Sequence, residues 1–273
     1  MPFFKAIRLA AIILACGVMN MTDARADALA DIRAKGEIVI GVRDDDAPYG
    51  FRNDNGELQG LEIELARDLA ERVGVTFKPF AINPTSRLQF IELELHDALI
   101  GMLAVTDRRQ QQARLVEPYY YATSFALLTR PQSGASKLAD LGGKTVCTLK
   151  AAHYAEAIAE HPARLKSLPV ETMQDARAAL GTGRCDAIAA ETATLVTMQK
   201  KSKGLNGHTL IPIDIPALPW AVAINHKLAG SDFERLISEA VADWHKSGKL
   251  KALEEKWLGR NTDWVLRQQE AHQ

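Results

Sequence analysis

The sequence predicts an α/β fold, because short apolar runs that are typical of buried strands alternate with amphipathic helix patterns. Residues 38–42 form a first apolar run, and residues 61–73 then carry apolar side chains at helical spacing. Residues 75–80 return as a strand. After the small-residue segment 132–136 the pattern begins again, so we expect a second α/β unit in the same chain.

The other elements follow the same logic. A hairpin is expected over residues 51–58, because Asn55-Gly56 is a favoured two-residue turn. One long amphipathic stripe, from Phe233 to Trp244, predicts a helix near the C-terminus. Three further buried strands are expected at residues 125–130, 185–190 and 219–224. The first of them would lead out of the first unit, and the last would cross back to it.

Composition excludes several classes of protein. The chain has 273 residues, of which 47% are hydrophobic and 25% are charged, as in ordinary globular proteins. Its formal net charge is −1, so no strong field favours nucleic acid or an anionic membrane as partner. We find no internal repeat and no low-complexity stretch.

The first residues are typical of an export signal. Two basic residues precede the apolar stretch 9–18, which is too short to span a bilayer, and Ala24-Arg25-Ala26 supplies a cleavage site. We therefore expect residues 1–26 to be a signal peptide and the mature protein to be periplasmic. The alternative is a lipoprotein attached through Cys16.

Export makes the two remaining cysteines interpretable. Cys147 and Cys185 would lie in an oxidising compartment, where an even pair favours a disulfide over a free nucleophile or a metal site. Closing that loop would stabilise the fold by roughly 4 kcal/mol.

A segment near the middle of the chain combines features of an anion site. Residues 98–105 are an apolar run that predicts a buried strand, and Thr106 is a credible N-cap for the turn that follows. A helix N-terminus exposes free backbone N–H groups, and Arg109 adds a planar fork of donors beside them. That combination suits a carboxylate. The alternative is that Arg109 is an ordinary solvated charge.

This segment, followed by Pro118-Tyr119-Tyr120, resembles the motif of the family 3 extracellular solute-binding proteins. These periplasmic receptors deliver polar amino acids to ABC importers. Leu141-Gly-Gly-Lys-Thr-Val146 and Gly248 to Gly259 resemble two further motifs of the family, so the resemblance covers nearly the whole mature chain. Some members also carry a cysteine pair in contexts similar to those of Cys147 and Cys185.

The resemblance implies the architecture and the partners. It implies two Rossmann-like lobes joined by two crossing strands, as in type II periplasmic binding proteins, with hinge closure over a ligand. We expect the first lobe over 27–129, the second over 130–221, and a return to the first over 222–273. The implied partners are an amino acid or small organic acid and an ABC permease, with no cofactor, no metal and a monomeric state.

The resemblance also implies the main ligand contacts. Arg109 corresponds to the arginine that binds the α-carboxylate of the ligand, and Glu191 stands where the family has an aspartate for the α-amino group. Arg43 and Arg87 have arginine counterparts in glutamate and aspartate receptors, which favours an acidic ligand. Their alternative role is a surface salt bridge with the aspartates at 44–46.

Four more positions belong to the expected site. Thr106 precedes the ligand-binding turn, and Tyr49 could pack against the ligand or in the core. Ala104 departs from the family, which has serine or threonine there. Residues 151–153 replace a Gly-Thr-Thr motif, so His153 either substitutes as a donor or is a surface histidine.

Two rival functions remain. Cyclohexadienyl dehydratases resemble this fold and use a glutamate just before the returning strand. Residues 216–219 offer no carboxylate there, so we do not expect an enzyme. A sensory or scaffold module that has lost ligand binding is the other alternative, because hydroxyl groups usual in the family are missing at residues 104 and 151–153.

Overall fold

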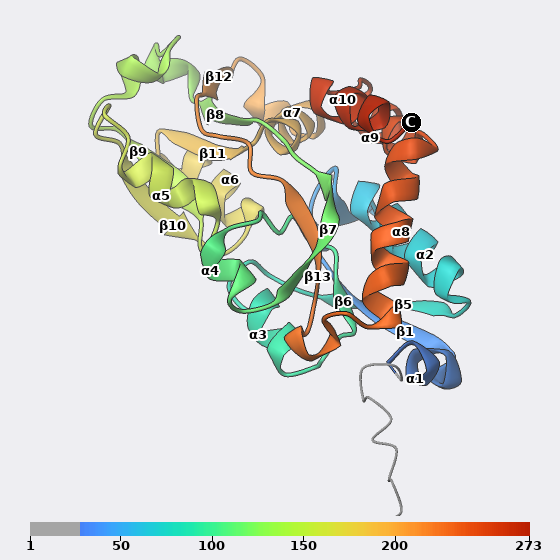
Figure 1. The fold of residues 1–273 in the computed structure, drawn as a ribbon. Coiled ribbons are helices and arrows are strands. Elements are labelled where there is room, and N and C mark those ends of the chain that lie inside the picture. Colours follow the sequence, from blue (N-terminus) through green and yellow to red (C-terminus); the bar gives the residue numbers. More distant parts are fainter. Residues whose placement is uncertain (1–27) are drawn as a thin grey trace, which may run out of the picture.

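The computed structural model describes residues 28–273 and has two lobes, each built on a five-stranded sheet (Figure 1). The first sheet has the order β5-β1-β6-β13-β7 and the second the order β10-β9-β11-β8-β12. This arrangement confirms the expected α/β fold with two Rossmann-like lobes.

The strands of the first sheet are β1 (Glu37–Val42), β5 (Thr76–Ala81), β6 (Ala98–Leu99), β7 (Arg114–Tyr121) and β13 (Trp220–Ile224). Its helices are α1 (Ala28–Lys35), α2 (Leu61–Val73), α3 (Arg87–Glu92), α4 (Asp107–Gln110), α8 (Asp232–Lys246), α9 (Lys249–Leu258) and α10 (Asp263–Ala271). Apolar clusters lie on both faces of the sheet, which explains why its strands are apolar runs rather than alternating patterns.

The second lobe repeats this plan. Its strands are β8 (Phe125–Thr129), β9 (Thr145–Leu149), β10 (Lys166–Val170), β11 (Ala187–Glu191) and β12 (Thr209–Ile213). Its helices are α5 (His153–Ala159), α6 (Met173–Gly181) and α7 (Thr192–Lys201). Two apolar clusters again cover the two faces of the sheet.

Several local expectations are met. The hairpin joins β3 (Gly50–Arg52) to β4 (Leu58–Gln59), and β2 (Asp45–Asp46) completes a small three-stranded sheet. The turn of the hairpin differs from the expected one: Gly56 N–H donates to the carbonyl of Asn53 at 2.8 Å, so Asp54-Asn55 rather than Asn55-Gly56 is at the centre. Helix α2 ends at Gly74, whose left-handed φ of 84° makes it the C-cap that glycine favours. The amphipathic stripe of α8 buries Phe233, Ile237 and Trp244 against the first sheet.

The expected strand over residues 98–105 is interrupted: only Ala98 and Leu99 form a strand, and pairing resumes at an isolated bridge between Ala104 and Trp220. Beyond them the backbone turns, and Met102 takes a left-handed φ of 53°. Side chains replace the ladder here: Met102 N–H donates to Glu62 Oε1 at 2.8 Å, and Arg87 donates to the carbonyl of Gly101 at 2.6 Å. The apolar run reflects burial alone, which an irregular segment shares with a strand.

The two crossings lie slightly away from the expected boundaries. Residues 122–124 lead from β7 to β8, and residues 214–219 lead from β12 to β13. Strand β8 pairs antiparallel with β11 and β12 in the second sheet, although residues 125–129 were expected in the first lobe. Trp220 and Ala221 of β13 belong to the first sheet. The sequence of a uniformly apolar strand does not indicate which sheet the strand joins, so it could not locate the boundary between the lobes.

No helix within residues 28–273 has the length and apolar character needed to cross a bilayer. The predicted signal peptide and Cys16 lie outside the described residues, so both stay predictions.

Cys147 and Cys185 are joined in a disulfide, with their Cα atoms 5.8 Å apart. Cys147 lies in β9, and Cys185 comes two residues before β11, so the bond ties two neighbouring strands of the second sheet. Both side chains are fully buried in the core of that lobe.

The disulfide predicts the thiol content and the stability of the second lobe. Thiol titration of the denatured, unreduced mature protein should detect no free thiol. Replacing both cysteines by alanine should lower the free energy of unfolding by about 4 kcal/mol in urea titrations. Two free thiols per chain would contradict the bond.

Candidate ligand-binding site

A small cavity of about 20 Å³ lies between the two lobes, so the lobes must open to admit a ligand. The first lobe lines it with Arg43, Pro84, Arg87 and Met102, and the second with Leu149, Ala152, His153, Tyr154 and Glu191. Arg43 directly follows β1, Leu149 ends β9 and Glu191 ends β11. Ligands of open α/β sheets bind beyond the carboxyl ends of strands, so the cavity is where this architecture predicts a site.

Glu191 is the one carboxylate among the described residues that line the cavity. Its side chain is 5% exposed, and Oε2 has no hydrogen-bond partner within residues 28–273. Burial, and then the neighbouring Asp46, raise the pKa of Glu191 to about 8. A cation brought to this oxygen would lower that pKa again and would give the carboxylate a partner.

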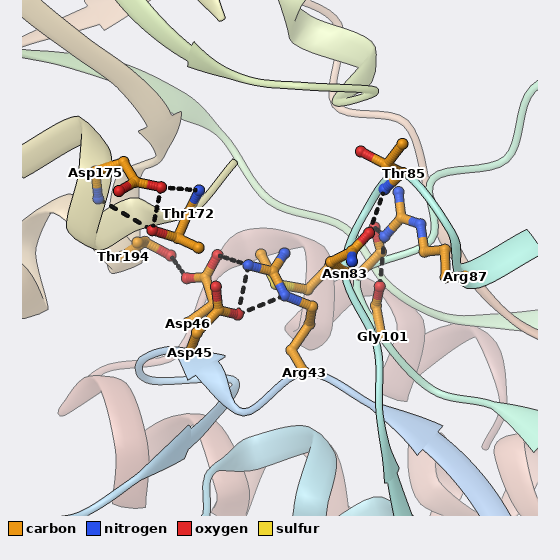
Figure 2. A network of polar contacts seen from close by, with 11 residues as sticks. Arg43, Asp45, Asp46, Asn83, Thr85, Arg87, Gly101, Thr172, Asp175 and Thr194 are labelled. Atoms are coloured by element: carbon orange, nitrogen blue, oxygen red, sulfur yellow. Dashed lines mark hydrogen bonds and ion pairs between the residues drawn. The ribbon is translucent and has the colours of Figure 1, made fainter. Parts of the chain in front are cut away.

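Arg43 is buried and already paired. Its Nε donates to Asp45 Oδ1 at 2.7 Å, and its Nη2 lies 2.6 Å from Asp45 Oδ1 and 3.6 Å from Asp46 Oδ2 (Figure 2). The alternative of a salt bridge with the aspartates therefore describes Arg43, except that Arg43 and Asp46 are buried and only Asp45 reaches the surface. Its charge is largely compensated before any ligand binds.

Arg87 lacks such compensation. It begins α3, and its Nη1 donates to the carbonyls of Gly101 and Met102 at 2.6 and 3.3 Å, as Figure 2 shows for Gly101. Nε has no partner, and the guanidinium meets no carboxylate within residues 28–273. Burial, and then the nearby Arg109 and Arg43, lower the pKa of Arg87 to about 9. The salt-bridge alternative does not describe this residue.

Arg109 connects the two lobes at the edge of the cavity. Thr106 caps α4 as predicted, accepting from the backbone N–H of Arg109 at 3.3 Å. The guanidinium is 8% exposed and donates to the carbonyl of Ala104 at 2.8 Å and, across the lobes, to that of Ala151 at 3.0 Å. Burial, and then Arg108, lower its pKa to about 10. Arg109 does not line the cavity; its partner across the lobes, Ala151, is the chain neighbour of the lining residue Ala152.

His153 and Tyr154 begin α5 and form part of the wall. Burial, and then the charges of Arg109 and Arg87, lower the pKa of His153 to about 4, so the ring is neutral at pH 7. Its Nε2 and the hydroxyl of Tyr154 have no hydrogen-bond partner within the described part of the chain. His153 is therefore a cavity residue with an available polar atom, not a surface histidine.

Tyr49 and Ala104 lie in the core of the first lobe and do not line the cavity. The ring of Tyr49 packs edge-on against Trp220, with 5.0 Å between centroids, and its hydroxyl donates to Thr123 Oγ1 at 3.3 Å. Ala104 acts through its backbone, since its carbonyl accepts from Arg109. The ligand-packing alternative for Tyr49 is not what the structure shows.

Sequence reasoning missed Pro84, Leu149 and Tyr154. Leu149 could have been found, because it ends a predicted strand. Tyr154 carried no such signal, since a tyrosine beside a histidine is ordinary. Within residues 28–273 no group of three or more His, Cys, Asp or Glu side chains could hold a metal ion.

Known proteins with the same architecture match nearly the whole chain. The L-cystine-binding protein TcyJ of Escherichia coli K12 is 26% identical over 256 residues, covering 91% of this chain and 92% of the relative. A substrate-binding protein of an ABC uptake transporter from Streptococcus pneumoniae, solved with bound histidine, superposes with a TM-score of 0.77 at 20% identity, covering 86% of this chain and 97% of that one.

A second solved structure has the same fold. The ancestral amino-acid-binding protein AncCDT-1, described as a precursor of cyclohexadienyl dehydratase, superposes with a TM-score of 0.75 at 20% identity, covering 84% of this chain and 99% of that one. Finally, the model of the bacterial extracellular solute-binding proteins, family 3, matches residues 38–260. The two lobes, the cavity between them and this match together show that the chain belongs to the family 3 bacterial extracellular solute-binding proteins.

Proposed function

We propose that this protein is the periplasmic substrate-binding subunit of an ABC importer and captures a polar amino acid in the inter-lobe cavity by hinge closure. One observation carries the proposal. Glu191, a buried carboxylate with an unpaired oxygen, and Arg87, a guanidinium without a carboxylate partner, line a cavity that both lobes enclose, and Arg109 donates across the lobes next to it. Burying such charged groups costs free energy unless a ligand pairs each of them with a group of opposite charge.

A zwitterionic amino acid fits this arrangement. Its ammonium group would pair with Glu191, and its α-carboxylate would accept from Arg109, whose planar fork can bind both oxygens. The described relatives support an amino-acid ligand, because one is named for L-cystine and another was solved with histidine. His153 and Tyr154 offer further polar atoms that could replace the hydroxyl groups usual in the family.

The acidic preference rests on Arg87. Because Asp45 and Asp46 already compensate Arg43, that residue no longer argues for an anionic ligand. Arg87 still lacks a carboxylate partner, and a second carboxylate on the ligand would supply one. A neutral side chain would leave Arg87 uncompensated in a closed cavity. We therefore rank glutamate and aspartate first, and a neutral polar amino acid second.

We propose that the protein delivers the bound molecule unchanged, since residues 216–219, before the returning strand, contain no carboxylate. The proposal implies a monomer that docks on an inner-membrane permease, without a cofactor. A dehydratase-like enzyme would turn over prephenate or arogenate, whereas this protein should not. A sensing module would bind the same ligand without a permease partner.

The ligand preference is tested by calorimetric titration of the mature protein with glutamate, aspartate, glutamine and leucine. Glutamate or aspartate should bind most tightly, and at 1,000 times its Kd should stabilise the fold by about 4 kcal/mol in thermal unfolding. Replacing Arg87 by glutamine should reduce the advantage of glutamate over glutamine. Tighter binding of leucine or glutamine than of both acids would contradict the charge argument.

Arg109 should be essential for affinity. Truncation in Arg109→Ala should cost at least about 2 kcal/mol of binding free energy, and Arg109→Lys should also weaken binding because an ammonium group cannot reproduce the fork. The neighbouring Arg108→Ala is the matched control, because Arg108 is exposed on the same short helix. Equal affinity in Arg109→Ala and Arg108→Ala would remove Arg109 from the site.

Glu191 should make binding depend on pH. Below its pKa of about 8 the free carboxyl is mostly protonated, and pairing with the ligand ammonium requires the proton to leave. Affinity should therefore rise between pH 6 and pH 8, by up to about tenfold per pH unit. Glu191→Gln should bind more weakly and lose this dependence. A wild-type affinity that is flat over this range would contradict the assigned contact.

A further inference from the structure

One pair of buried polar side chains joins the two lobes directly. Asp46 lies in β2 of the first lobe, and Thr194 lies in the first turn of α7 in the second. The hydroxyl of Thr194 donates to Asp46 Oδ1 at 2.7 Å, and the two residues are 2% and 1% exposed (Figure 2). Neither residue lines the cavity, so neither was needed for the ligand contacts above.

Both residues are nevertheless one step from a residue that does line the cavity. The other oxygen of Asp46 lies 3.6 Å from Nη2 of Arg43, which is held between Asp45 and Asp46. Thr194 stands three residues after Glu191, which is the N-cap residue of α7. The Thr194–Asp46 bond therefore connects the segment that carries Arg43 to the helix start that presents Glu191.

We propose that Thr194 and Asp46 are positioning residues for ligand capture, whose hydrogen bond holds the lobes closed and brings Glu191 opposite the arginines of the first lobe. The inference rests on the proposed function. It adds to that function a pair of residues that act on closure without touching the ligand.

The placement of this bond makes it sensitive to closure. Thr192, at the start of the same helix, donates its backbone N–H to the carbonyl of Ser124 at 2.9 Å, within the crossing segment that must act as the hinge. The Thr194–Asp46 bond instead links α7 to the small three-stranded sheet, and neither residue belongs to a crossing segment. Opening the lobes would separate the two side chains and let water solvate them.

The hydrogen bond from Thr194 stabilises the closed state because it serves a buried carboxylate. A carboxylate that is taken out of water loses hydration, and its stability then depends on the hydrogen bonds that replace it. Thr194 supplies the one hydrogen bond that Asp46 Oδ1 receives, while Oδ2 has no hydrogen-bond partner within the described residues. Removing that donor therefore penalises the closed state, in which Asp46 is buried, more than the open state.

A second contact between α7 and the small sheet supports the same closed geometry. The ammonium group of Lys201, at the end of α7, lies 4.0 Å from the ring centroid of Phe51 in β3. Helix α7 thus meets the small sheet at both of its ends. Its first turn provides the buried contact, which is the one that a conservative substitution can test.

The test uses three variants of the mature protein. Thr194→Val removes the donor at constant shape, Thr194→Ser keeps a hydroxyl, and Thr197→Val is the matched control one turn further along α7, where the threonine forms no side-chain hydrogen bond within residues 28–273. Binding of L-glutamate and L-glutamine is followed by stopped-flow kinetics, and the ligand-free radius of gyration by small-angle X-ray scattering.

Thr194→Val should raise Kd about tenfold, through a faster dissociation rate with an association rate within about twofold of wild type. Thr194→Val should also have a larger radius of gyration without ligand, because the closed form loses the hydrogen bond between Thr194 and Asp46. Thr194→Ser and Thr197→Val should behave as wild type in both measurements. A general loss of folding would instead lower the fraction of active protein in Thr194→Val and leave the rates of the remainder unchanged.

The outcomes separate this inference from the proposed function. If wild type binds and Thr194→Val matches Thr197→Val in dissociation rate and in radius of gyration, the positioning role is wrong while the receptor function stands. If no amino acid of the panel binds wild type, the proposed function fails, and the radius of gyration of the two valine variants alone decides the role of Thr194. Equal radii would then reject it.

Discussion

The burial of charge where the two lobes meet is the constraint on which the rest of the structure depends. Arg43, Arg87, Arg109 and Glu191 are all nearly inaccessible to water, and each must be compensated in the closed molecule. Asp45 and Asp46 compensate Arg43, and backbone carbonyls serve Arg87 and Arg109. Carbonyls are weaker partners for a guanidinium than carboxylates, and Glu191 keeps an unpaired oxygen. A ligand with charges of both signs resolves this imbalance.

The fold brings these groups together because they stand at the ends of strands and helices. Glu191 ends β11 and begins α7, so one residue belongs both to a rigid strand and to the helix that reaches the other lobe. Arg109 is fixed by a four-residue helix that Thr106 caps, and its side chain already spans the lobes to Ala151. Closure is therefore supported by the protein's own cross-lobe contacts, among which the Thr194–Asp46 bond is the most buried pair of side chains.

Local chemistry in the sequence predicted the features that depend on neighbouring residues alone. The Thr106 cap, the Gly74 C-cap and the existence of the hairpin needed only a few adjacent positions, and the structure confirms them, although the turn of the hairpin is centred on Asp54-Asn55. The extent of the strand after Ala98 and the sheet to which β8 belongs depend on distant partners, so apolar runs could not specify them. The partners of Arg43 were open for the same reason, and Tyr154 carried no distinguishing pattern.

The central claim is that an amino acid binds in the inter-lobe cavity and stabilises its closure. Hydrogen–deuterium exchange of the mature protein, with and without a saturating amino acid, tests it most directly. The account predicts slower exchange of backbone amides in residues 101–109, 149–156 and 190–195, which border the cavity from both lobes, and little change in α10. Protection confined to one lobe, or absent from all three segments while the ligand is bound, would contradict it.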